Sequence, residues 1–211
     1  MRYAKAICFV LLIVYTLCLM YAELRYSQDF VRNFFSDIYG PTIFFGINTT
    51  LSALLLWCIA LVFGISGMAL ERKPGQRRTK VFYVSQVLIF CYLGLDDRFR
   101  LHEWVDQHLR HGEDFVLVGA AALEACLVIF MGDLRNWPRR TRLYLGIGAV
   151  LSGVMIFIDV FLPYDLTLRL SCEDLSKVWA EVFLFMFAFE ILRAHIDELK
   201  SRASSHSTPS H

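Results

Sequence analysis

The chain has 211 residues, of which 56% are hydrophobic and only 19% are charged, and its mean hydropathy is +0.49. A soluble domain of this size does not need so much apolar bulk, which includes 18 phenylalanines, so the composition argues against a soluble protein. The net charge of +1 and the lack of a basic stripe interleaved with aromatic residues argue against a nucleic-acid partner. We therefore predict an all-α, polytopic membrane protein whose partners are membrane lipids.

Apolar stretches that approach the roughly 20 residues needed to span a bilayer recur along the chain. They predict six transmembrane helices, at 4–22, 43–70, 81–103, 115–132, 143–163 and 175–194. The first stretch ends in CLMYAELRY, which lacks a small-x-small cleavage site, so we expect an anchor rather than a signal peptide. The motif PGQRR predicts a turn after the second helix. We expect one domain over residues 1–200 and a disordered tail over 201–211.

Lysine and arginine are distributed unequally between the two sets of predicted loops. One set, which includes both termini, holds most of them, among them Arg77, Arg78, Arg139 and Arg140. The opposite set is acidic, with its carboxylates crowded into residues 96–114. Because short basic loops stay in the cytoplasm, we predict that both termini are cytoplasmic. The compact loops and the lack of organellar signals favour a bacterial inner membrane.

Three acidic residues lie inside apolar segments: Glu124 in AALEACL, Asp159 in MIFIDVF and Glu181 in VWAEVFLF. An unpaired charge in hydrocarbon is costly, so such residues are often functional. With a rise of about 1.5 Å per residue, Asp96, Asp159 and Glu181 lie at one level in the outer half of a bilayer. Glu124 lies slightly deeper, and Asn48 of the second span enters at a similar outer level. Five spans therefore contribute a polar group to one layer.

The stretch GLDDRFRLHEW, at the end of the third predicted span, adds several charged residues and His102. On a helix, Asp96 and Glu103 share a face but lie about 10 Å apart along the axis. They cannot easily bind the same small ion unless the helix breaks. His102 points about 100° away from Glu103. We expect Asp97 to be a solvated loop charge.

One interpretation of the layer is a divalent-metal site for Zn, Mn or Fe, because carboxylates and histidine are ligands for these ions. A bound metal lowers the pKa of a water for attack on an ester or amide, which predicts a lipid- or amide-modifying hydrolase. The metal ligands are then Asp96, His102, Asp159 and Glu181, and the catalytic residues are Glu103 and Glu124, with one carboxylate as general base. The chain has no HExxH or HxxxH motif, so the pattern is not specific.

The architecture resembles the membrane hydrolase superfamily that includes alkaline ceramidases, in which Asp and His residues from several spans hold a metal. This sequence lacks that group's histidine pairs and one of its spans, so no residue role is carried over from it.

Two alternatives stay open beside the hydrolase. Buried acids also relay protons or bind transported ions, which predicts a proton- or cation-coupled transporter. The lack of inverted repeats argues against this alternative. In the other alternative, the acids pair with Arg98, Arg100, Arg169 and Lys177, and the protein is a structural subunit of a homo-oligomer or of a membrane complex.

Overall fold

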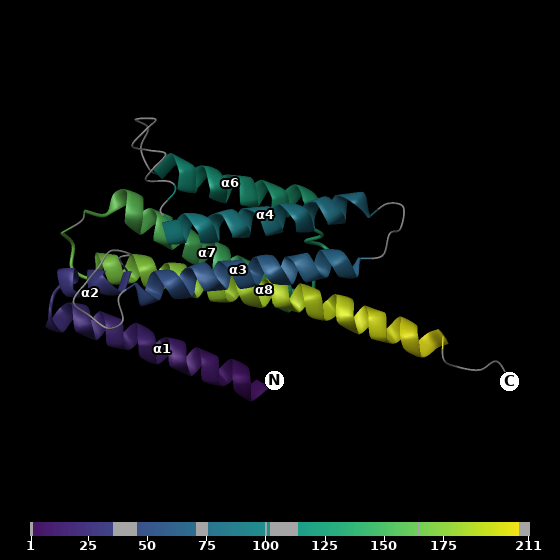
Figure 1. The fold of residues 1–211 in the computed structure, drawn as a ribbon, viewed down its shortest axis with the longest axis horizontal. Coiled ribbons are helices and arrows are strands. Elements are labelled where there is room, and N and C mark those ends of the chain that lie inside the picture. The colour runs from purple at the N-terminus through teal and green to yellow at the C-terminus, as the bar shows by residue number, and fades with distance from the viewer. Residues whose placement is uncertain are drawn as a thin grey trace.

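The structure is a computed structural model, and it describes residues 2–35, 46–70, 76–99, 101, 114–163 and 165–206. These ranges hold seven helices and no strand, which confirms the all-α prediction for the described part of the chain. The helices are α1 (Arg2–Arg25), α2 (Gln28–Phe35), α3 (Ile47–Ala69), α4 (Arg77–Phe99), α6 (Asp114–Met131), α7 (Arg139–Phe161) and α8 (Arg169–His206). Apart from the short α2, they run lengthwise along the molecule (Figure 1).

Each of the six predicted spans corresponds to one long helix, but the helices differ in how apolar they are. Three of the described stretches are long and apolar enough to cross a membrane: Ala6–Arg25 in α1, Ile47–Ala69 in α3 and Arg139–Phe161 in α7. A shorter apolar stretch, Val118–Met131, lies in α6. These helices suggest a membrane protein, while the count of six spans stays a prediction.

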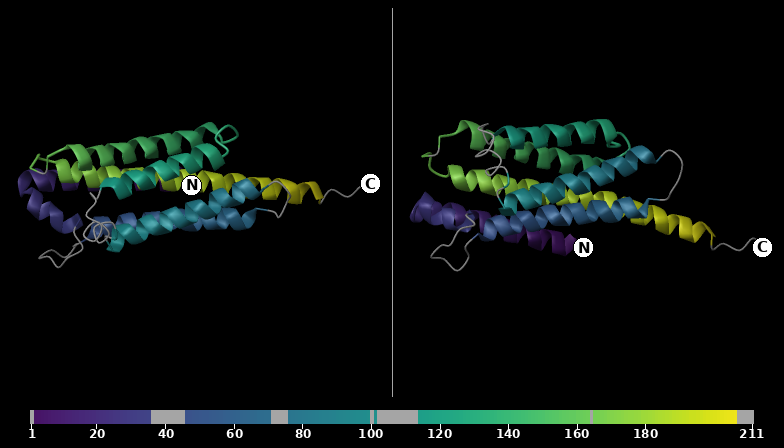
Figure 2. Two further views of the ribbon diagram at one scale, coloured as in Figure 1. Left: turned by 90° about the horizontal axis from the view of Figure 1, so that it is seen from above. Right: turned by 45° about the horizontal axis from the view of Figure 1, so that its top comes forward.

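Helix α8 is the central element of the bundle. It packs along α7 on one side and along α3 on the other, and α3 in turn packs along α4. Figure 2 shows α8 running between α7 and the α3–α4 pair, with its C-terminal part projecting past the other helices. It continues to His206, into the segment 201–211 that was expected to be a disordered tail.

The centre of the bundle is an aromatic core formed by Phe63 of α3, Phe82 and Phe90 of α4, and Phe187 of α8. Phe63 is completely buried, and its ring centroid lies 6.1, 6.0 and 5.9 Å from those of Phe82, Phe90 and Phe187. Aromatic pairs at such distances stabilise a fold beyond the area that they bury. The aromatic core therefore fixes α3, α4 and α8 against one another.

A glycine allows α3 and α4 to approach closely on the other side of Phe90. A Cβ atom added to Gly94 of α4 would lie 2.4 Å from Nε1 of Trp57 on α3, which is closer than real atoms approach. Small residues at helix interfaces permit this kind of packing. The close approach brings Asp96 and Asp97, two and three residues after Gly94, next to the bundle interior.

The short helix α2 was not among the predicted elements. Its apolar residues at helical spacing pack inward: Val31 is fully buried, and Phe30 and Phe34 pack against α1 and α8 residues. Its polar residue Asp29 is 90% exposed, and the Ser27 hydroxyl accepts a hydrogen bond from the Phe30 N–H at 3.1 Å as an N-cap. Helix α2 thus covers one end of the bundle.

The two ends of the bundle differ in charge. Figure 1 shows that α8 ends toward the same side from which α1 begins. This basic end also holds the starts of α4 and α7, where Arg77, Arg78, Arg139 and Arg140 are exposed. The opposite, acidic end holds the end of α4, the end of α7 and the start of α8.

Candidate functional site

The structure describes four of the six predicted site residues: Asp96, Glu124, Asp159 and Glu181. The other two, His102 and Glu103, lie outside the described residues.

Glu181 of α8 faces α3 near the acidic end, and its side chain is buried at 4% exposure. The hydroxyl of the fully buried Ser52 donates a hydrogen bond to its Oε1 atom at 2.5 Å. Its Oε2 atom is also buried and has no hydrogen-bond partner among the residues that the structure describes. Burying an unpaired carboxylate oxygen is costly, so this position is suited to a proton or a cation.

Arg169, at the start of α8, joins α7 and α8 through two carboxylates. Its guanidinium lies 3.3 Å from Oδ1 of Asp159 on α7 and 3.0 Å from Oε2 of Glu173 on its own helix. It also donates hydrogen bonds to the backbone carbonyls of Leu162 and Asp159, at 3.0 and 2.8 Å. Because Arg169 is only 3% exposed, these partners are required to offset the burial of its charge.

Lys177 of α8 forms an ion pair with Oδ1 of Asp97 on α4. The Asp97 side chain is only 8% exposed, so the expectation that Asp97 is a solvated charge was wrong. The close packing at Gly94 explains the difference, because it carries the end of α4 into the bundle. The Asp97 Oδ2 atom is buried without a hydrogen-bond partner in the described part of the chain. Its neighbour Asp96 is buried as well, at 4% exposure.

Five of these carboxylates form one electrostatically connected group, which we call the acidic layer: Asp97, Asp159, Glu173, Asp174 and Glu181. Asp174 interacts with Glu173, Asp159 and Glu181, and Lys177 connects Glu181 to Asp97. Arg169 and Lys177 form ion pairs within this group. The group therefore places several carboxylates close together.

Glu173 and Asp174 precede the apolar stretch 175–194, and the pKa of each carboxyl group is raised, mainly by burial and further by neighbouring acids. Burial raises the pKa of Glu173 to about 7; the Asp159 carboxylate acts in the same direction and Arg169 in the opposite one. Burial and the neighbouring Glu173, Asp159 and Glu181 raise the pKa of Asp174 well above its usual value. The acidic layer is thus arranged to hold protons.

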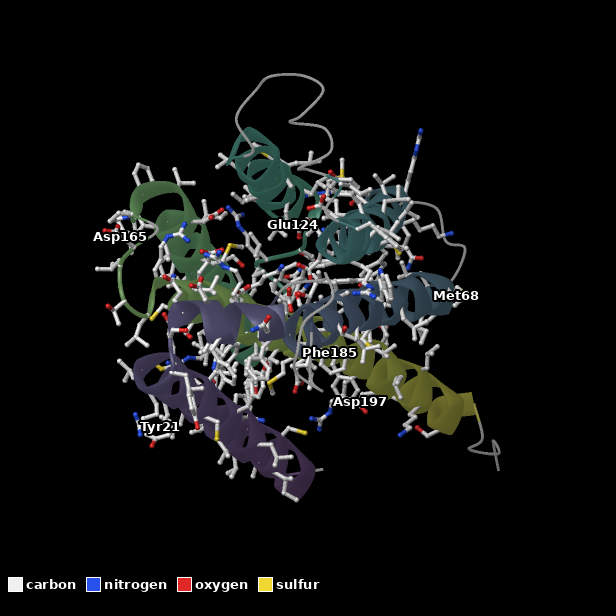
Figure 3. The ribbon with its side chains drawn as sticks, turned by 60° about the vertical axis from the view of Figure 1, so that its left-hand side comes forward. Tyr21, Met68, Glu124, Asp165, Phe185 and Asp197 are labelled. Atoms are coloured by element: carbon white, nitrogen blue, oxygen red, sulfur yellow. The ribbon has the colours of Figure 1, made fainter. Side chains whose placement is uncertain are left out.

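Glu124 of α6 does not join the acidic layer. Its Oε2 atom accepts a hydrogen bond from Nε2 of the fully buried Gln86 at 2.9 Å. Gln86 lies on α4 about 16 Å from Asp97 along the helix axis, toward the basic end. Figure 3 shows Glu124 between α6 and α4. The structure therefore separates Glu124 from Asp159 and Glu181.

Glu23 of α1 is a buried acid that the sequence reasoning did not select, because it lies beyond the first predicted span. Its carboxylate accepts hydrogen bonds from the backbone N–H groups of Leu168 and Ser171, at 2.8 and 3.2 Å, and from the Ser171 hydroxyl. These are donors at the N-terminus of α8, where a negative charge is favourable. Glu23 therefore fastens the end of α1 to the start of α8.

Asn48 of α3, which was expected to contribute to the layer, accepts a hydrogen bond from the Tyr15 hydroxyl of α1 at 3.2 Å. At the next residue of α1, the Thr16 hydroxyl accepts a hydrogen bond from the Trp179 indole N–H at 3.0 Å. These contacts hold α1 against α3 and α8 near the acidic layer, so Asn48 has a structural role.

The predicted metal ligands do not converge within the described residues. No group of three or more His, Cys, Asp or Glu side chains is placed there to hold a metal ion. Asp159 pairs with Arg169, and Glu181 bonds to Ser52.

Residues 6–191 match a protein family described as "Domain of unknown function (DUF8692)". No curated protein and no solved structure matches the chain. The matched range includes the aromatic core and the whole acidic layer. Because the match covers well over half of the sequence, the chain belongs to this family, DUF8692.

Proposed function

We propose that the protein is a proton- or cation-coupled membrane transporter that binds its coupling ion at the acidic layer. The proposal depends on the buried Glu181 carboxylate, whose Oε2 atom has no hydrogen-bond partner among the described residues and which lies in a group of neighbouring acids. Buried carboxylates in such a group are stable only when they take up protons or a cation. Intramembrane acids of this kind commonly belong to ion pathways.

The arrangement of charges supports an orientation for this transporter. The exposed arginines at the starts of α4 and α7 lie at the basic end, and short basic segments face the cytoplasm. We place the protein in the inner membrane with both termini in the cytoplasm and six spans. The acidic layer then faces the periplasmic side, from which it takes up its ion.

The aromatic core supplies the barrier that a coupled transporter needs. Phe63 and its ring partners lie between the acidic layer and a second polar contact at the basic end, where the Tyr83 hydroxyl and the His195 Nε2 atom are 2.6 Å apart. A tightly packed apolar constriction excludes water and ions. In this conformation, the acidic layer therefore exchanges ions with the periplasmic side only.

A metal-dependent hydrolase that acts on a lipid or an amide is the second candidate. It is favoured by the buried Asp96 and Asp97 side chains, which lie in the last turn of α4 at the acidic end, with His102 and Glu103 a few residues further along the chain. With Asp159, Glu181 and Glu124 as further acids, the chain contains the ligand types that Zn, Mn or Fe accepts.

Ion flux into liposomes tests the transporter proposal. Purified protein is reconstituted into vesicles that contain a pH-sensitive dye, and a pH or sodium gradient is applied. We expect flux with the wild type and its loss in Glu181→Gln. The matched control is Asp165→Asn, which removes an exposed carboxylate from the same end of the molecule (Figure 3) and should keep the flux.

Elemental analysis of the same samples separates the other candidates. A stoichiometric metal that is lost in Asp159→Asn, without ion flux in the wild type, would replace the transporter by the hydrolase. Folded variants with neither flux nor metal would leave the structural-subunit alternative.

A further inference from the structure

A pocket of about 610 Å³ lies between α1 on one side and α3 and α8 on the other. Its walls are almost wholly apolar and include Phe9 and Leu12 of α1, Leu55 of α3, and Val182, Met186 and Phe189 of α8.

Helix α1 contacts the bundle by hydrogen bonds toward the acidic end and, closer to its N-terminus, by the Phe9 ring, which lies 5.9 and 5.8 Å from the rings of Trp179 and Phe183 on α8. Toward the acidic end, Glu23, Tyr15 and Thr16 hold α1 against its neighbours by hydrogen bonds. Toward the N-terminus, α1 diverges from α3 and α8 (Figure 1). Leu11, which also lines the pocket, is 62% exposed, so the pocket opens sideways at the surface of the bundle.

The dimensions of the pocket restrict what can fill it. The lining residues of α8 run from Val178 to Phe189, a length of about 16 Å. A volume of about 610 Å³ lies in the range of pockets that hold one small ligand. A narrow chain that lies along α8 therefore matches both the length and the volume of the pocket.

The chemistry of the walls restricts the occupant further. The Tyr15 hydroxyl at one end already donates to Asn48, and no charged residue lines the pocket in the described part of the chain. Apolar cavities of this size are typical ligand sites, and an apolar wall favours an apolar occupant. In a bilayer, the narrow apolar chains at hand are the acyl chains of phospholipids.

We propose that this pocket binds one acyl chain of a bilayer phospholipid, seated lengthwise between α1 and α8. The proposal does not depend on ion transport, because the pocket lies beside the acidic layer and shares none of its carboxylates.

Photo-crosslinking in vesicles tests the proposal. The protein is reconstituted with a trace of phosphatidylcholine that carries a diazirine in its acyl chain, and the adducts are mapped by mass spectrometry after digestion. We expect adducts on residues 8–15 and 178–189. Unlabelled phosphatidylcholine should compete for the pocket, so that the yield of these adducts follows a saturable binding curve. Adducts on the exposed face of α7, around Val150, report the surrounding lipid and should fall only in proportion to dilution.

Pocket-filling variants provide the second arm. We expect Val182→Phe to lower the adducts inside the pocket about tenfold. The control Val150→Phe adds the same volume at a site that is 67% exposed and should leave them unchanged. Pocket adducts that match those of α7 in both arms would overturn the proposal. So would labelling by a free fatty-acid analogue alone, or crosslinks from the pocket to a second copy of the chain.

Discussion

The acidic layer and the aromatic core lie at successive levels of the same helices but are held together by different interactions. In the aromatic core, Phe63 is fixed by rings from α4 and α8 at distances of about 6 Å. In the acidic layer, the contacts are directional bonds between charged or polar groups. We infer from this difference that the packing of the aromatic core stabilises the bundle. This stability offsets the free-energy cost of burying carboxylates in the acidic layer.

The largest expected effect comes from the aromatic core. Phe63→Ala should lower the free energy of unfolding by about 4 kcal/mol, because it leaves a cavity at a fully buried site. Thermal unfolding in detergent, followed by tryptophan fluorescence, measures the loss. Phe157→Ala, at a ring that is 54% exposed on α7, is the control and should change little. If both variants lost the same free energy of unfolding, the aromatic core would not be the main source of the bundle's stability.

A somewhat smaller effect is expected at Arg169. Arg169→Ala should cost about 3 kcal/mol, because it leaves Asp159 and Glu173 without their shared cation at a buried site. Adding Asp159→Asn should restore part of the loss. The control Arg32→Ala removes an exposed pair with Asp29, 3.9 Å apart, and should change stability by less than about 1 kcal/mol. An Arg169→Ala protein as stable as the wild type would contradict the ion-pair account.

The smallest effect is a dependence of stability on pH. The pKa of Glu173 is about 7 in the folded protein, above its ordinary value of 4.5, so the folded state holds its proton more tightly. Stability contributed by this group should therefore be present at about pH 5 and fall as the pH rises through 7. Melting temperatures of the wild type should drop over this range, and those of Glu173→Gln should drop less. Asp165→Asn should follow the wild type.

Much of the helical framework could be predicted because it depends on local properties of the chain. Apolar stretches of sufficient length predicted where α1, α3 and α7 lie, and each of the other long helices overlaps a predicted span, although α8 extends beyond the predicted 175–194 at both ends. The buried positions of Asp96 and Glu181 also followed from apolar neighbours on the same helix. Helix α2 was missed because it is short and its apolar face emerges only at a spacing of three to four residues.

The sequence by itself determined that this chain forms apolar helices with acids at one level, because hydropathy and helical periodicity act within each segment. Only the tertiary structure decided the partners of those acids: Lys177 with Asp97, Arg169 with Asp159, and Ser52 with Glu181. Which faces of two helices meet depends on how their side chains interdigitate, as at Gly94 and Trp57. This packing depends on residues that are far apart in the sequence, so no single segment specifies it.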